Sequence, residues 1–173
     1  MSDSIDQFFS EWSSQDTTLP DLTKEMQYIY RIAKISRILG ERLDQTCNLF
    51  GITRSQFEAM AVLRRLHPKA LNAQEIMQAS MLTSGSVTAM INQLLNAGLV
   101  KRKADPEDAR RIQITLTTKG IRIIEAALKD RINDNKKLAN LLTMDDRRQM
   151  NDLMRDLLTK LEKSGNNYDQ EHA

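Results

Sequence analysis

The stretch Leu82–Gly120, with the sequence LTSGSVTAMINQLLNAGLVKRKADPEDARRIQITLTTKG, decides the fold because its hydrophobic period changes along its length. In the first part, apolar residues recur at helical spacing as far as Gly98, which predicts a helix. In the second part, apolar and polar residues alternate over Ile112–Leu116, which is the period of a strand. A polar turn containing a proline, 104–111, separates this strand from a second candidate strand, Leu99–Lys103. We therefore expect a helix followed by a β-hairpin.

Three more helices are predicted before this stretch. Apolar residues at helical spacing over Leu22–Phe50 indicate a long helix. Thr53–Gln56 and Asn72–Glu75 both have the side chains of a capping box, so each is expected to begin a further helix. A short helix, a tight turn, a second helix and a hairpin make a winged helix-turn-helix, which we expect over 53–118.

Helical spacing returns after Gly120 and continues to about Leu161, with a capping signal at Thr143. The helices at both ends of the chain carry more apolar surface than one small domain can cover, so we expect a homodimer. The expected fold class is mainly α with a small β-hairpin wing: a winged helix-turn-helix with long N- and C-terminal dimerisation helices. The expected parts are an N-terminal arm over 1–20, a single domain over 21–162 (dimerisation helices 21–50 and 119–162, DNA-binding lobe 53–118) and a flexible tail over 163–173.

The composition excludes several classes of protein. The net charge is only +2, so any basic surface for nucleic acid must be local. The lone cysteine, Cys47, excludes an internal disulfide framework and a cysteine-rich zinc site, and we expect it to be a buried small residue rather than a redox switch. The two histidines lie far apart and no phosphate loop or nucleophile motif occurs, so we expect no metal, no cofactor and no enzyme activity. No apolar run approaches the roughly 20 residues that span a bilayer, and the first residues do not look like a signal peptide, so we expect a cytoplasmic protein without a membrane partner.

The predicted helix after Ser84 and the hairpin together form a candidate surface for double-stranded DNA. One face of the helix is apolar and suits the core, whereas the other has small or hydrogen-bonding side chains that fit a major groove. The hairpin has five cations in eleven residues, and an arginine at its tip can enter a narrow minor groove. The residues that we expect to contact DNA are Ser84, Ser86, Thr88, Ala89, Asn92, Gln93, Lys103, Arg110 and Arg111.

Two motifs in this region resemble the MarR family of transcription regulators. The motifs are Ser84-Gly85-Ser86-Val87-Thr88 with the later Leu94 and Ala97-Gly98-Leu99-Val100, and Asp105-Pro106-Glu107-Asp108-Ala109-Arg110 with the later Leu116-Thr117 and Gly120. The resemblance implies a dimer joined by the first and the last two helices, with recognition helices in successive major grooves of a palindromic operator. It also implies that Arg110 is the minor-groove arginine. The chain departs from many members at Ala89 and Gln93, where an arginine is common.

A narrower resemblance is to the PecS-type, urate-responsive branch of that family. It implies a ligand site that includes Trp12, Glu58 and Arg65, with Met90 in place of a second arginine. Losing that cation removes a partner for an anion, so the resemblance favours a small aromatic or phenolic acid over urate as the effector. Each residue also has a structural interpretation. Trp12 would anchor the arm or a short helix, Glu58 and Arg65 would form an ion pair on one helix face, and Met90 would lie in the core.

Three functions therefore stay open at this point. The first is a ligand-responsive repressor that a small aromatic acid releases from a palindromic operator. The second is a winged-helix adaptor that binds proteins and has no sequence-specific DNA binding, which the uncharged Ala89 and Gln93 favour and which Arg110 opposes. The third is a small enzyme, for which the sequence offers no catalytic residues.

Overall fold

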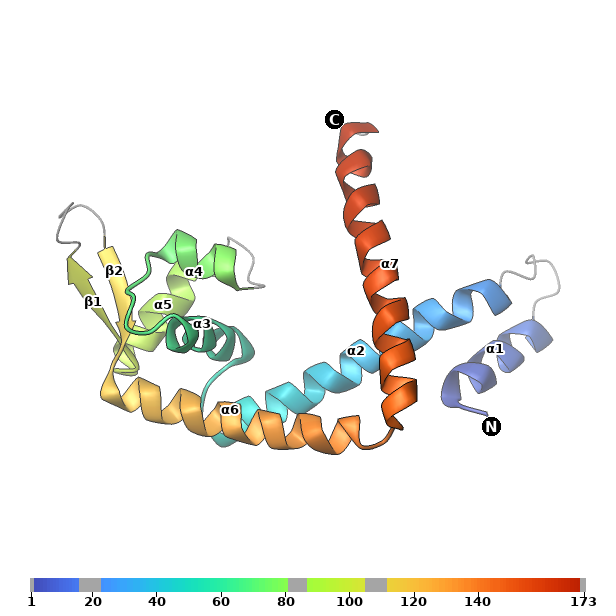
Figure 1. The fold of residues 1–173 in the computed structure, drawn as a ribbon, viewed down its shortest axis with the longest axis horizontal. Helices are drawn as coiled ribbons and strands as arrows, with labels where there is room; N and C mark the ends of the chain where they lie inside the picture. The colour runs from blue at the N-terminus through green and yellow to red at the C-terminus, as the bar shows by residue number, and fades with distance from the viewer. Residues whose placement is uncertain (1, 16–22, 81–86, 105–111, 172–173) are drawn as a thin grey trace. The chain divides into compact units, whose positions relative to one another are not determined.

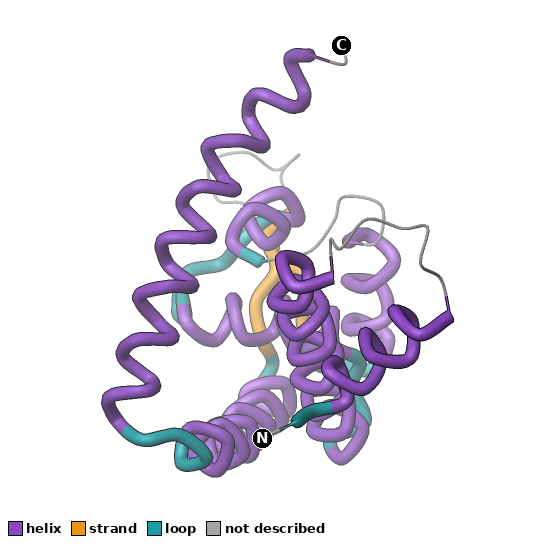
Figure 2. Tube along the Cα trace, turned by 90° about the vertical axis from the view of Figure 1, so that its right-hand side faces the viewer, coloured by secondary structure: helices purple, strands orange, loops and turns teal. Residues whose placement is uncertain are grey.

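The computed structural model describes residues 2–15, 23–80, 87–104 and 112–171 (Figure 1). Helices make up most of these residues, and the strands that they include form one short hairpin (Figure 2). The elements are α1 (Ser4–Gln15), α2 (Thr23–Leu49), α3 (Arg54–Arg65), α4 (Ala73–Ala79), α5 (Val87–Asn96), β1 (Val100–Ala104), β2 (Ile112–Leu116), α6 (Thr118–Ala139) and α7 (Met144–Glu171). The prediction of a mainly helical winged helix-turn-helix is confirmed.

The helix α1 occupies most of the segment that we expected to be an arm or a short helix. Asp3 caps it, because its Oδ1 accepts hydrogen bonds from the backbone N–H groups of Ile5 and Asp6 at 2.8 and 3.0 Å. The Asp3 carboxylate also pairs with Arg31 of α2, with 2.8 Å between Oδ2 and Nε. Phe9 packs edge-on against Tyr30 of α2, with the ring centroids 5.1 Å apart. The helix is thus held on α2 by both charge and apolar contact.

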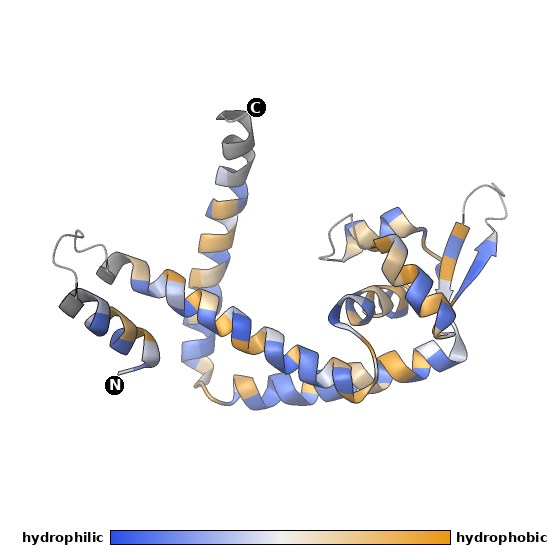
Figure 3. Ribbon diagram, turned by 180° about the vertical axis from the view of Figure 1, so that it is seen from behind, coloured by the Kyte–Doolittle hydropathy of each residue, from blue (hydrophilic) through white to orange (hydrophobic). Residues whose placement is uncertain are grey.

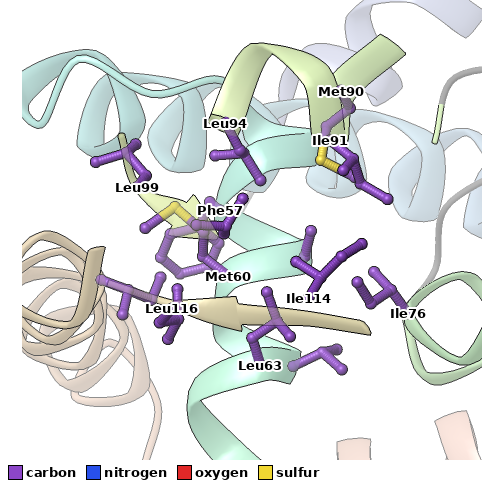
Figure 4. Packing of buried hydrophobic residues seen from close by; sticks show 14 of the residues in the cluster. Phe57, Met60, Leu63, Ile76, Met90, Ile91, Leu94, Leu99, Ile114 and Leu116 are labelled. Carbon is purple, nitrogen blue, oxygen red and sulfur yellow. The ribbon is translucent and has the colours of Figure 1, made fainter. Parts of the chain in front are cut away.

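The winged-helix lobe is built from α3, α4, α5 and the hairpin. Both predicted capping boxes are present, since Thr53 and Gln56 cap α3 and Asn72 and Glu75 cap α4. In the hairpin, Val100 pairs with Leu116 and Lys103 with Gln113, in antiparallel register. The buried residues of these elements form one core (Figure 4). Its members in this region include Phe57, Met60, Leu63, Ile76, Met90, Ile91, Leu94, Leu99, Ile114 and Leu116.

Two close contacts join the hairpin to the rest of the lobe. Leu71, which precedes α4, exchanges backbone hydrogen bonds with Ile114 of β2 at 3.1 and 2.8 Å. At the other end, the Thr117 hydroxyl accepts the Gly120 N–H at 3.0 Å and donates to the Gly98 carbonyl at 2.8 Å. This hydroxyl caps α6 and fixes the start of that helix beside the end of α5.

The chain forms two compact units, Met1–Leu128 and Lys129–Ala173. The second unit contains the end of α6 and the whole of α7, whose first turn is capped by Thr143, with 3.2 Å between its Oγ1 and the Asp146 nitrogen. Although a flexible tail was expected from residue 163, α7 continues to Glu171, and no proline interrupts this stretch. Among the described residues, no helix has the length and apolar character needed to cross a membrane.

Candidate nucleic-acid interface

The two faces of α5 differ as the sequence predicts. Val87, Met90, Ile91 and Leu94 are buried, and Figure 4 shows Met90, Ile91 and Leu94 directed into the core. The opposite face is exposed and carries four of the residues expected to contact DNA. These are Thr88, Ala89, Asn92 and Gln93. Ser84 and Ser86, from the same prediction, lie outside the described residues.

The wing adds cations beside this helix. Lys101, Arg102 and Lys103 follow one another along β1, and all three are exposed. Arg110 and Arg111, expected at the hairpin tip, lie outside the described residues. Of the three cations on β1, only Lys103 was predicted to contact DNA.

The exposed amides of α5 are bonded to side chains of other elements. The Asn92 Oδ1 accepts a hydrogen bond of 2.8 Å from the Arg102 guanidinium on β1. The Gln93 Oε1 accepts one of 3.2 Å from the Gln56 Nε2 in the first turn of α3. The sequence marked Gln56 only as a capping residue and Arg102 only as one of several cations. Nothing in local spacing indicated either partner, because both contacts depend on how α5 packs on its neighbours.

A small hollow lies between α5, the hairpin and the start of α4. It encloses about 130 Å³, and its lining residues are Ala73, Thr88, Ile91, Arg102, Ile112 and Ile114. The lining is mainly apolar, with one guanidinium and one hydroxyl. Such a site suits a flat apolar group that carries an acceptor or a negative charge.

Two ion pairs connect α3 to neighbouring long helices. At its start, Arg54 Nε and Nη2 lie 3.0 and 2.6 Å from the carboxylate oxygens of Asp44 on α2. The hydrogen bond to Asp44 raises the pKa of the Arg54 guanidinium above its usual value. At its end, Arg64 Nη2 lies 2.6 Å from Glu125 Oε1 on α6. These pairs tie the lobe to α2 and to the first half of α6.

The residues predicted to bind a ligand fall into different environments. Trp12 packs edge-on against Phe8 of the same helix, with centroids 5.4 Å apart, in the aromatic cluster that includes Tyr30. Met90 lies in the core of the lobe and is 4% exposed. Glu58 is half-buried and Arg65 is exposed, both on α3. A ligand site made of these four residues stays a prediction.

Two other kinds of site were considered from the sequence, a reactive cysteine and a metal site. Cys47 is 1% exposed within the core, as expected for a buried small residue. In the part of the chain that the structure describes, no group of three metal-ligating side chains comes together.

Comparison with known proteins agrees with this geometry. Residues 52–112 match the sequence model of the MarR family. The HTH-type transcriptional regulator PecS of Dickeya dadantii is 25% identical over 83% of this chain and 86% of its own length. The crystal structure of a MepR–DNA complex from Staphylococcus aureus superposes with a TM-score of 0.70, at 28% identity, over 78% of this chain and 98% of that one. Wild-type MarR of E. coli, without ligand, has the same fold, with a TM-score of 0.63 at 24% identity over 75% of this chain and 95% of that one.

Proposed function

This chain belongs to the MarR family of winged helix-turn-helix transcription regulators, and from that premise we propose that it is a homodimeric repressor released from a palindromic operator by a small aromatic acid. The observation that carries the proposal is the exposed face of α5, with its small and amide side chains, next to three consecutive cations on β1. The helix face offers groups for base edges, and the cations offer charge for phosphates. The structure of MepR with DNA, a protein of the same family and similar fold, supports this assignment.

A dimer is proposed because the long helices leave apolar side chains uncovered. On α7 the exposed apolar residues follow a helical period, as Met150, Leu153, Met154, Leu158 and Leu161. Figure 3 shows hydrophobic segments in orange along this helix. A single helix with such a stripe requires a partner surface. Two copies would place two α5 helices in half-sites about 34–36 Å apart, one turn of DNA.

The effector is proposed to be a small aromatic acid on two grounds. Met90 stands where the urate-responsive branch has an arginine, so a strongly anionic purine would lack one partner. The hollow beside Thr88 and Arg102 has apolar walls with a single guanidinium, which matches an aromatic carboxylate. A ligand weakens DNA binding if it binds the free protein more tightly than the DNA-bound protein, and a preference of about 1–3 kcal/mol changes affinity roughly 5–150-fold.

The first test is fluorescence anisotropy with duplex DNA from the region upstream of this protein's own coding sequence. We expect saturable binding by two protomers per site, and an affinity that falls steeply as the salt concentration rises. Benzoate or a hydroxybenzoate should then weaken the binding more than urate does. Binding no tighter than to random DNA, by a folded dimer, would favour the adaptor function instead.

Arg110→Ala separates the repressor from the adaptor. A DNA-binding protein loses a groove contact with this change, and its operator affinity should drop about tenfold. Arg155→Ala is the matched control, because it removes an exposed arginine from α7, a helix that carries none of the residues proposed to contact DNA. Equal affinities for the two variants would contradict the assigned role of the wing.

A further inference from the structure

Gln56 is held in one orientation by the capping box of α3. Its Oε1 accepts a hydrogen bond of 2.9 Å from the backbone N–H of Thr53, and the backbone N–H of Gln56 donates to the Thr53 hydroxyl at 3.3 Å. A backbone N–H cannot accept a hydrogen bond, so the atom that faces it must be the amide oxygen. The amino group of Gln56 therefore points the other way, towards α5.

This orientation fixes the amide of Gln93 in turn. The Gln56 amino group lies 3.2 Å from the Gln93 side chain, and an amino group must face an acceptor. The oxygen of Gln93 is thus directed at Gln56, and its amino group is directed away from α3. The same holds for Asn92, whose oxygen faces the Arg102 guanidinium, a group with donors only.

We propose that Gln56 is a positioning residue for DNA recognition, which makes Gln93 present its amino group, a donor, to the operator. The inference rests on the proposed function and goes beyond it by naming what this position recognises. In the major groove, guanine offers two adjacent acceptors, O6 and N7, and no donor. An amino group facing the groove disfavours cytosine, which offers only a donor, and the two adjacent acceptors of guanine favour it over the single acceptors of adenine and thymine. We therefore expect guanine on the contacted strand opposite Gln93.

Gln56→Glu tests the proposal because it preserves the cap and replaces the hydrogen-bond donor that faces Gln93 with an acceptor. Glutamate is a usual residue at this position of a capping box, so its carboxylate still accepts the Thr53 N–H. Its other oxygen accepts instead of donating, so the amide of Gln93 turns its amino group inward and its oxygen outward. An outward oxygen favours the amino group of cytosine or adenine over guanine.

The experiment is selection of bound duplexes from a random pool, followed by sequencing and by anisotropy on the enriched sites. Gln56→Glu should change the base at one symmetric pair of operator positions from guanine to cytosine or adenine. The preference for the new base should be on the order of tenfold. Gln93→Leu should lose the preference at that pair, and adding Gln56→Glu to it should change nothing further.

Gln74→Glu is the matched control, since it adds the same charge at an exposed position of α4 in the same lobe. This control should lower the affinity for all DNA sequences by the same factor and leave the selected sequence unchanged. If Gln56→Glu also selects the wild-type sequence, the positioning role is overturned. A wild-type chain that enriches no sequence overturns the proposed function, and this inference with it, so the two failures are distinguishable.

Discussion

Asp3 combines a capping role with an ion pair at the start of α1. Its carboxylate accepts two backbone hydrogen bonds and pairs with Arg31, which lies 28 residues further along the chain. The hydrogen bond from Arg31 and those from the backbone lower the pKa of Asp3 to about 2, from 3.8. The ion pair holds α1 on α2 only while the carboxylate is charged, whereas the cap acts within α1.

Asp3→Asn is expected to remove the ion pair and to keep the cap, because asparagine is also a favoured N-cap residue. Since the pKa of Asp3 is lower in the folded state, the pair stabilises the fold above about pH 4, and its contribution is lost as the pH falls towards 2. The variant should therefore have a lower urea midpoint at pH 7, and the difference should shrink between about pH 4 and pH 2. The fluorescence of Trp12, the single tryptophan, follows the transition. A difference that does not depend on pH would contradict the role of the charge.

Gly120 is the residue on which the contact between α6 and the hairpin depends. A Cβ at this position would lie 2.0 Å from the Leu99 carbonyl oxygen and 3.2 Å from the Leu116 side chain. The Leu99 oxygen belongs to the backbone just before β1 and cannot move without shifting the wing. The start of α6 therefore packs closely against the ends of the hairpin only because position 120 has no side chain.

Gly120→Ala is expected to lower the free energy of unfolding by about 2 kcal/mol or more, since backbone must move to admit the methyl group. Gly51→Ala is the matched comparison. Gly51 has a φ of 66° with open space around its Cα, so an alanine there costs only the strain of the left-handed conformation, about 1 kcal/mol. Chemical denaturation of both variants measures the two costs. If both variants lose the same free energy of unfolding, the wing relaxes around the methyl group at position 120.

At the scale of the whole molecule, the proposed function requires two copies to associate. The apolar stripe of α7 is the strongest sign of a partner, because Leu153 is 73% exposed and Leu158 and Leu161 are each 57% exposed. Burying such side chains releases roughly 25 cal/mol per Å² of apolar surface, enough to drive association when a long stripe is covered.

Replacing both Leu153 and Leu158 with glutamate is therefore expected to convert a dimer into a monomer. Operator affinity should fall by at least tenfold, because a monomer contacts one half-site only. Thr159→Glu is the control, since it adds a charge at an exposed position off the stripe. Sedimentation velocity and anisotropy measure the two effects. A double variant that stays dimeric would mean that other helices join the subunits.

The sequence by itself determined the order and type of the elements from α2 to the start of α7. Capping boxes at Thr53 and Asn72 place the starts of α3 and α4, and the alternation over Ile112–Leu116 gives β2 its bounds. It also assigned the exposed and buried faces of α5. These features are local, because caps and hydrophobic periods involve residues within a few positions of one another.

Only the tertiary structure decided which side chains meet across elements. Gln56 and Gln93 are 37 residues apart, Arg64 and Glu125 are 61 apart, and no local period relates them. The same holds for the aromatic contact between α1 and Tyr30 and for the burial of Met90. The physical reason is that such contacts depend on the separation and rotation of packed helices. These are set by the whole core together, and no single segment encodes them.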